Sequence, residues 1–175
     1  MSFDPKGQVY HVPVLNEVYG VSPEERTIIN IYGGKSSFTN HQVDLALFLL
    51  HYLLGTKGIA LSGKRVSEKE LKGGEMFFRG PHTSPTKGLI EKYGKTPKGL
   101  IDAGLRVGGK PSELGDAAIE LRVAPKIPVT YVLWAEDDEF PASVSILFDP
   151  TIQEFIPLDI IYGVTILTHH RLVEG

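Results

Sequence analysis

Cysteine is absent from this chain of 175 residues. Its absence excludes disulfide bonds, zinc sites with Cys ligands, iron–sulfur clusters ligated by this chain and a catalytic thiol. Because freedom from disulfides fits a reducing compartment, we expect a cytoplasmic protein.

Long apolar segments are also absent. The longest apolar run, Leu45–Leu50, is far shorter than the roughly 20 residues that cross a bilayer. The first 20 residues are of mixed polarity and lack the continuous apolar region of a signal peptide. We expect no membrane contact. With 42% hydrophobic and 22% charged residues, the sequence predicts a single globular domain over residues 1–175.

Several motifs of known chemistry are missing. Neither a Gly-x-Ser-x-Gly nucleophile turn nor a His-Glu-x-x-His metal motif occurs. Gly33-Gly34-Lys35 ends like a phosphate-binding loop, but Ile29 occupies the position that requires a glycine. Gly104 and Gly108 lie at the end of a predicted helix rather than between a strand and a helix, so dinucleotide binding is not expected.

Charge is unevenly distributed along the chain. The net charge is only −3, yet residues 57–110 carry 12 Lys and Arg against 5 Asp and Glu, a net of +7, and the remainder has a net of −10. This pattern indicates either that the middle segment faces an anion or that it folds against the acidic remainder. Nucleic acid is not the expected anion, because the basic residues are scattered and the aromatic residues show no stacking pattern.

The pattern of apolar residues predicts an α+β fold, with an antiparallel sheet, a long buried central helix and several short inserted helices. The predicted strands cover residues 118–123, 129–134 and 142–148, with the middle one central and a hairpin loop over 135–141. The predicted helices cover residues 40–54, which are apolar on most faces, 84–94, 96–108 and 157–173.

The N-terminal third gives shorter signals. Residues 10–14 predict a strand that Pro13 confines to a sheet edge. Ser22-Pro23 predicts a short helix, because the serine can cap it and the proline fits its first turn. Further short strands are predicted over residues 27–32 and 59–61, and Ser67 with Glu70 predicts a capping box.

An acidic segment lies within the predicted hairpin. Glu136, Asp137, Asp138 and Glu139 follow one another between Trp134 and Phe140. Adjacent carboxylates are ligands for hard cations, and they also attract basic partners. The alternative is a solvated hairpin tip that prevents edge pairing.

The segment Arg79–Pro85 is the predicted ligand site. Arg79, His82, Thr83 and Ser84 precede a predicted helix start, where free N–H groups favour a phosphate or a carboxylate. We assign Lys87 and Trp134 to the same site, as a cation and an aromatic contact. His82 could instead bind a metal or act as an axial ligand of a metallated macrocycle. An ordinary capped loop is the alternative.

His41 is a second candidate metal ligand. Asp44 lies one helical turn beyond it and could orient the His41 ring, as carboxylates do for metal-bound histidines. His51 is too far along the helix to share a mononuclear site with His41. The alternative is a polar edge of a buried helix.

The C-terminal two thirds resembles a known family. The residues that carry the likeness are Leu61-Ser62-Gly63, Gly73-Gly74, Leu114-Gly115-Asp116-Ala117-Ala118 and Pro128-Val129, above all Trp134 with Asp137-Asp138-Glu139-Phe140-Pro141, and then Leu147-Phe148-Asp149. Over residues 50–173 the chain resembles the bacterial and archaeal family catalogued as domain of unknown function 3786.

The resemblance implies a context rather than a reaction. Members look like proteins of strict anaerobes, and some carry an added cysteine-rich iron–sulfur segment, which implies work beside corrinoid, one-carbon or low-potential redox enzymes. This chain has no cysteine, so any cluster belongs to a partner. It also has Arg65-Val66 where the family pattern has an aromatic residue after Ser62-Gly63.

Three functional hypotheses follow. The first is a non-catalytic accessory domain that binds an anionic cofactor, such as a corrinoid or another tetrapyrrole, through the Arg79–Pro85 segment. The second is a small enzyme that uses His82 and the acidic hairpin, which requires these residues to meet in one cleft. The third is an interaction module that docks an iron–sulfur or corrinoid methyl-transfer protein through the acidic hairpin.

Overall fold

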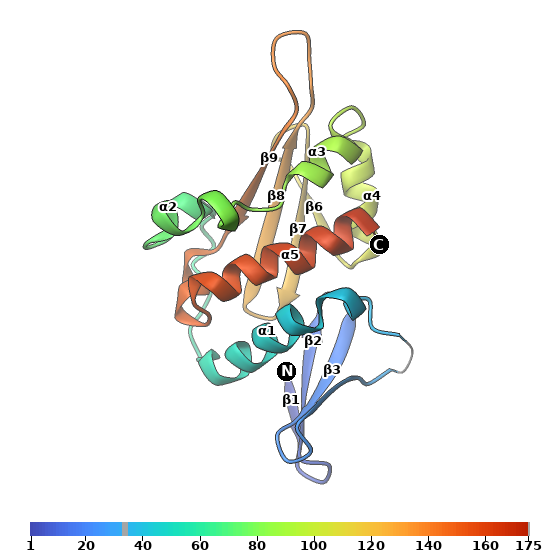
Figure 1. Cartoon of the computed structure of the whole chain (residues 1–175), viewed down its shortest axis with the longest axis vertical. Coiled ribbons are helices and arrows are strands. Elements are labelled where there is room, and N and C mark those ends of the chain that lie inside the picture. The colour runs from blue at the N-terminus through green and yellow to red at the C-terminus, as the bar shows by residue number, and fades with distance from the viewer. Residues whose placement is uncertain (33–34, 175) are drawn as a thin grey trace.

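The computed structural model describes residues 1–32 and 35–174 and confirms the α+β class. Instead of one antiparallel sheet it contains two (Figure 1). The N-terminal sheet, in the order β1-β2-β3-β4, consists of β1 (Ser2–Asp4), β2 (Val9–Val14), β3 (Glu17–Ser22) and β4 (Thr27–Asn30). The C-terminal sheet, in the order β5-β9-β8-β7-β6, consists of β5 (Val66–Ser67), β6 (Lys110–Ser112), β7 (Ala117–Ala124), β8 (Ile127–Trp134) and β9 (Ser143–Phe148).

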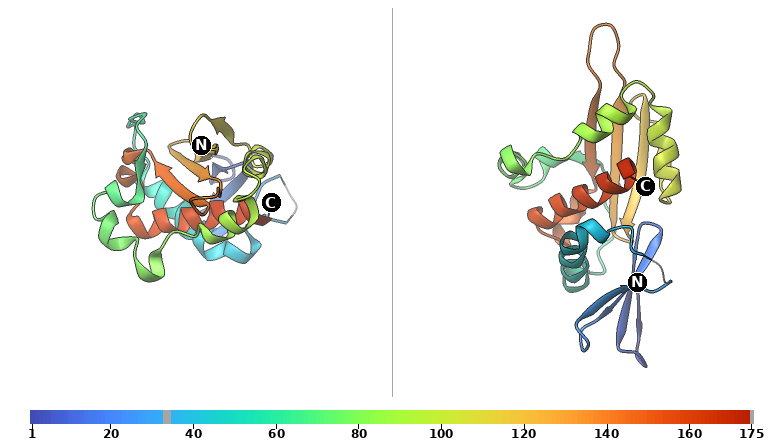
Figure 2. Two further views of the ribbon diagram at one scale, coloured as in Figure 1. Left: turned by 90° about the horizontal axis from the view of Figure 1, so that it is seen from above. Right: turned by 45° about the vertical axis from the view of Figure 1, so that its right-hand side comes forward.

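The helices pack on one face of the C-terminal sheet and between the two sheets (Figures 1 and 2). They are α1 (Gln42–Gly55), α2 (Gly74–Phe77), α3 (Lys87–Tyr93), α4 (Lys98–Arg106) and α5 (Leu158–Glu174). Short 3-10 turns cover Thr39–His41, Glu68–Glu70, Gly80–His82 and Pro150–Glu154. None of the helices in the described ranges is long and apolar enough to cross a membrane.

The strands of the C-terminal sheet agree with the alternation in the sequence. β8 lies between β7 and β9, which confirms the central strand, and the connection from β8 to β9 is the predicted hairpin. Odd-numbered residues of β7 and β8 face the helices. Gly104 of α4 lies so close to Ile119 that a Cβ would come within 2.1 Å of its Cγ1, which explains a glycine inside a helix.

The N-terminal sheet corrects one prediction and refines another. Ser22-Pro23 does not begin a helix, because residues 23–26 form the turn between β3 and β4, and Ser22 pairs with Thr27. The Ser22 hydroxyl accepts a hydrogen bond from the Glu25 amide, as it would in a helix cap, so the same local signal serves a turn. β2 is an inner strand up to His11, where its pairing with β1 ends, and Pro13 lies in the part that forms a sheet edge.

The loop before β5 corrects a second prediction. Residues 59–61 form no strand. This segment is tied down by side chains instead: Lys126 Nζ donates to the Ile59 carbonyl, and the Asp149 carboxylate accepts from the amides of Ser62 and Gly63. These contacts satisfy backbone groups that a strand would have paired.

Helix α1 is confirmed, but it buries only one of its faces. Leu45, Phe48, Leu49 and Tyr52 are buried and belong to the core that α1 shares with α5. Val43, Leu47, Leu50 and Leu54 form an exposed stripe on the other side, with Leu54 88% exposed. The helix with most of its faces buried is α5, which crosses the C-terminal sheet (Figure 1).

A nearly buried ion pair joins α5 to the N-terminal sheet. Arg171 of α5 donates to Glu17 Oε1 at 2.8 Å and to Asn16 Oδ1 at 3.0 Å, at the turn between β2 and β3. Glu17 also accepts from the Tyr19 hydroxyl and from the Ser37 amide. Burial raises the pKa of Glu17, but the hydrogen bonds from Ser37, Tyr19 and Arg171 outweigh it and leave the pKa below its ordinary value.

We predict that Glu17→Gln destabilises the protein by roughly 3 kcal/mol at neutral pH, because it leaves Arg171 as a buried charge without its counterion. The lowered pKa of Glu17 contributes stability above the ordinary glutamate value of 4.5, and this contribution is lost as the pH falls below that value. The difference between wild type and variant in urea denaturation should therefore shrink below pH 4.5. An equal difference at all pH values would contradict the role of the charge. Glu113→Gln, at an exposed position, is the control.

Candidate functional site: an apolar cavity between the N-terminal sheet and α1

The cations of the predicted ligand segment do not converge. Arg79 Nη2 pairs with Glu75 Oε1 at 2.9 Å, and Lys87 Nζ pairs with Glu91 Oε1 at 3.6 Å, both as exposed pairs on their own turns. The His82 ring stacks on Phe77 with the centroids 4.6 Å apart and meets Tyr162 edge-on. His82 is thus held by aromatic rings rather than directed at the helix start.

Thr83 and Ser84 do come together in a shallow hollow. It measures about 360 Å³ and also contains residues 67–69 and 144–146. Ser84 does not cap α3, because its hydroxyl donates to the Glu68 carboxylate, and Thr86 occupies the position before the helix. Thr83 donates to the Gly80 carbonyl. Trp134 lies at the end of β8, and neither it nor Arg79, His82 or Lys87 lines this hollow.

The acidic hairpin projects away from the rest of the chain (Figure 1). Asp137 Oδ1 accepts hydrogen bonds from the amides of Glu139 and Phe140 at 2.8 and 2.7 Å, and these bonds lower the pKa of Asp137. Glu136 pairs with Lys95 at 3.2 Å. The hairpin tip and the His82 segment lie in different parts of the molecule (Figures 1 and 2), so the single cleft that the enzyme hypothesis requires is not formed.

His41 is paired with a histidine that the sequence analysis did not connect to it. His41 Nδ1 lies 3.3 Å from Asp44 Oδ2, as expected, and its ring centroid lies 4.6 Å from that of His170 on α5. His170 also contacts Glu174. Within residues 1–32 and 35–174, no group of three or more His, Asp or Glu side chains is arranged to hold a metal ion.

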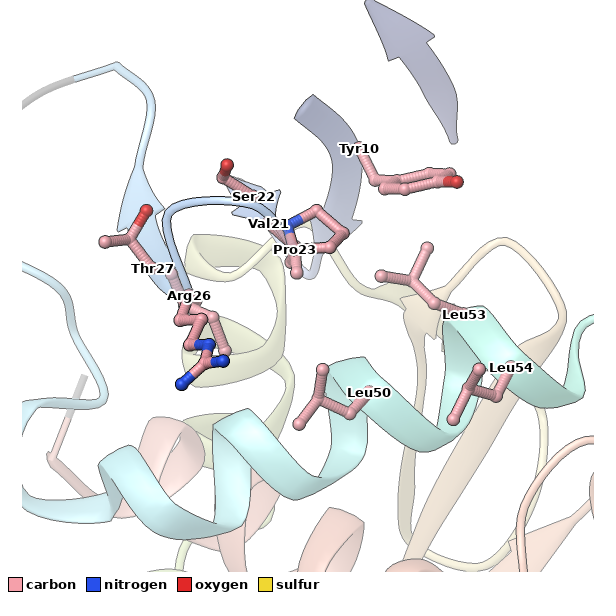
Figure 3. A pocket seen from close by; sticks show the side chains of 10 residues that line it. Tyr10, Val21, Ser22, Pro23, Arg26, Thr27, Leu50, Leu53 and Leu54 are labelled. Carbon is pink, nitrogen blue, oxygen red and sulfur yellow. The ribbon is translucent and has the colours of Figure 1, made fainter. Parts of the chain in front are cut away.

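An apolar cavity lies between the N-terminal sheet and α1 (Figure 3). Its volume is about 500 Å³, within the range of small-molecule sites. The sheet packs on the core through Val12, Val14, Tyr19 and Val21 and diverges from α1 toward the β3–β4 turn. The cavity is the space left between them, and its lining consists of Tyr10, Val21, Ser22, Pro23, Arg26, Thr27, Ile28, Leu50, Leu53 and Leu54.

The floor of the cavity belongs to the apolar stripe of α1. Leu50 and Leu54 point from the helix toward the turn, with Leu53 beside Tyr10 (Figure 3). Leu50 is 45% exposed although it lies opposite an apolar wall. Apolar side chains that face each other across open space gain by covering each other or a ligand.

Arg26 is the cation of this cavity. It is exposed, lies at the end of the β3–β4 turn, and its guanidinium extends over the opening toward Leu50 (Figure 3). The structure records no ion pair or hydrogen bond for its side chain within the described residues. Its backbone has a φ of 55°, a left-handed conformation that costs an arginine roughly 1–2 kcal/mol and that glycine adopts freely.

The lining residues do not match a metal-ligated macrocycle. Haem iron takes His, Cys, Met or Tyr as its axial ligand, and among the ten lining residues only Tyr10 belongs to this set. The Tyr10 ring already packs against Phe3, with the ring centroids 4.7 Å apart. The cavity instead combines apolar walls with one cation.

The sequence analysis missed this site for a definite reason. The apolar run Leu45–Leu50 predicts a helix that is buried on most faces, which places Leu47 and Leu50 in the core, although both are 45% exposed. The spacing of Val43, Leu47, Leu50 and Leu54, with steps of four, three and four residues, is a signal of a second apolar stripe. No pattern in the sequence predicts that the Arg26 side chain lies at the opening of the cavity.

Comparison with known proteins gives one family. The family model described as Domain of unknown function (DUF3786) matches residues 1–171. The likeness therefore extends beyond residues 50–173 and includes the N-terminal sheet and the cavity. Neither a curated protein nor a solved structure matches the chain.

We predict that the exposed stripe contributes little to stability. Leu54→Gln and Leu47→Gln should change the free energy of unfolding by less than about 0.5 kcal/mol, as exposed substitutions do. Leu49→Ala, at a fully buried position of the same helix, should cost roughly 3 kcal/mol. Thermal and urea denaturation test both statements. A large loss from Leu54→Gln would show that the stripe is part of the core.

Proposed function

The chain belongs to the family described as Domain of unknown function (DUF3786), and we propose a function for it from the cavity. We propose that the protein is an accessory domain that binds a small apolar molecule with one anionic group. The observation that carries the proposal is the apolar cavity of about 500 Å³ with Arg26 at its opening. The apolar body of the ligand lies on Leu50, Leu53 and Leu54, and its anion pairs with the guanidinium.

Two physical arguments support this ligand class. A ligand that covers Leu50 and Leu54 removes apolar surface from water at positions where the fold does not do so itself. Arg26 stands at a left-handed backbone position that favours glycine, and strain of this kind concentrates where a side chain serves a function. A charge-assisted hydrogen bond to the anion offsets that cost.

The corrinoid or tetrapyrrole predicted from the sequence belongs to the same broad class only through its apolar body and its anionic side chains. The lining lacks His, Cys and Met, so binding of such a molecule would rest on apolar contact and on Arg26 rather than on a metal bond. Titration with cobalamins and haem tests this class of ligand, with binding followed by absorbance and by the melting temperature of the protein.

A second role, docking of a protein partner, is favoured by the projecting hairpin. Asp138 and Glu139 are exposed at its tip next to Phe140, which is 67% exposed. An exposed aromatic ring beside carboxylates fits a basic protein surface. The partner that we propose is an iron–sulfur or corrinoid protein, because this chain itself has no cysteine.

For the cavity, we predict saturable binding of anilinonaphthalene sulfonate, an apolar probe with one anionic group, measured by fluorescence and calorimetry. Arg26→Gln should weaken its binding about tenfold, because one charge-assisted hydrogen bond is lost. Binding of the uncharged phenylnaphthylamine should not change in this variant. Leu53→Trp, which fills the cavity, should weaken both probes.

Arg26→Gly provides the sharpest control for this prediction. It removes the cation and relieves the backbone, so the melting temperature should not fall while the sulfonate binds more weakly. Lys72→Gln, an exposed cation outside the cavity, should bind both probes as the wild type does. Equal loss of the charged and the uncharged probe in Arg26→Gln would refute the role of the guanidinium.

For the hairpin, we predict that the immobilised protein retains an iron- or cobalt-containing protein from an anaerobic extract of its native host at low salt and releases it at 0.5 M salt, where charge interactions are screened to about 4 Å. The double variant Asp138→Asn with Glu139→Gln should retain none of it. Metal analysis of the eluate makes the measurement, and retention that ignores both salt and the variant would exclude the hairpin as the docking site.

A further inference from the structure

A second hollow lies on the face of the C-terminal sheet that the helices do not cover. It measures about 240 Å³ and is lined by residues of the loop before β5 and of β7, β8 and β9. Three cations from two segments border it: Lys64, Arg65 and Arg122. It shares no lining residue with the apolar cavity.

Both carboxylates of this hollow already have partners within the fold. Glu120 pairs with Arg65 at 2.9 Å. Asp149 accepts five hydrogen bonds, from the amides and hydroxyls of Ser62 and Thr151 and from the Gly63 amide, at 2.7 to 3.2 Å. Burial acts to raise the pKa of Asp149, but these bonds outweigh it and hold the pKa below its ordinary value.

Within the described residues, two of the three cations that border the hollow have no recorded partner. The structure records no interaction for the side chain of Lys64 or for that of Arg122 within the described residues, whereas several other cations of the basic segment have an acidic partner. Charges from separate segments that border one small hollow raise its affinity for an anion. Arg122 offers a planar fork that matches an oxyanion, and Lys64 offers a mobile point charge.

Thr130 adds a hydroxyl group to the lining of this hollow. Its side chain is only 2% exposed, and it faces this hollow from the central strand, opposite Glu120 in the register. No hydrogen bond of its hydroxyl is found within the described part of the chain. Among the described residues, the buried side-chain atoms without a partner are His169 Nδ1 and Arg171 Nε, so the Thr130 hydroxyl is accessible from the hollow and can donate to a ligand there.

We propose that this hollow is a binding site for a phosphate-type oxyanion, held by Arg122 and Lys64 with Thr130 as a hydroxyl donor. The volume suits a phosphate group with a small substituent rather than a nucleotide or a macrocycle. The site goes beyond the proposed function, because it lies on a different sheet and takes a different ligand. The basic segment contributes Lys64 and Arg65, on the loop after Gly63, to this site. Arg79, which the sequence analysis assigned to anion binding, does not line it.

The test uses inorganic phosphate as the probe, with calorimetric titration of the full chain at low salt. Binding should be saturable, and Arg122→Gln should weaken it about tenfold, the effect of losing one charge-assisted hydrogen bond. Lys64→Gln should weaken it and also lower its dependence on salt. Thr130→Val, which keeps the shape and removes the hydroxyl, should weaken it severalfold.

Two comparisons decide the outcome. Lys98→Gln and Lys72→Gln, at exposed cations outside the hollow, should both bind phosphate as the wild type does. Absence of saturable phosphate binding would overturn the proposal, and so would an equal loss in Lys98→Gln, which would indicate diffuse charge attraction. Because Arg26→Gly tests the apolar cavity alone, failure of one site is distinguishable from failure of the other.

Discussion

The ion pair between Arg171 and Glu17 fixes how the N-terminal sheet meets α5, beside the direct bond from the Leu15 amide to the Val123 carbonyl. It joins the last turn of the central helix to the turn between β2 and β3, and both side chains are nearly buried. Arg171 also lies over the Phe38 ring. Its Nε has no hydrogen-bond partner in the described residues, so the guanidinium does not use all of its donors. A buried pair of this kind fixes orientation more than it adds stability. Because it anchors the N-terminal sheet at one end only, the other end diverges from α1 and the apolar cavity forms there.

The limits of sequence reasoning follow from what local patterns encode. Alternation in residues 118–123 and 142–148 predicted β7 and β9, and a run that is apolar on both faces, residues 129–134, predicted β8 as the central strand. Ser22-Pro23 was wrong as a helix start, since a hydroxyl that binds an amide three residues later serves a turn equally well. The run around α1 predicted the helix but not its exposed face, since burial depends on what packs against it. The position of Arg26 over the cavity depends on the sheet register, which no local signal contains.

The residues that carry the family resemblance act mainly on the backbone. Asp149 holds Ser62 and Gly63, Asp137 holds the hairpin turn, and Asp116 accepts from the Ala135 amide at 2.8 Å. Each carboxylate satisfies amides of an irregular segment, which is a common role of aspartate in turns. The motif therefore identifies the architecture and leaves the chemistry to other positions. This explains why the most recognisable string in the chain, the acidic hairpin, lies away from both proposed ligand sites.

Several cations of the basic segment over residues 57–110 form ion pairs with the acidic remainder of the chain. Lys57, Arg65 and Lys95 pair with Glu154, Glu120 and Glu136, which all belong to the acidic remainder. Folding against that remainder, one of the two readings of the charge pattern, thus accounts for part of the imbalance. Such exposed pairs contribute at most about 1 kcal/mol each, but they remove cations from the set that can attract a ligand. Among the cations with no recorded ion pair in the described residues, Lys72 and Lys98 are exposed away from both hollows. Lys64 and Arg122 border one hollow, and Arg26 lies at the apolar cavity. The two proposed sites are therefore defined by unpaired charges that the fold places at a hollow, and not by where the sequence concentrates charge.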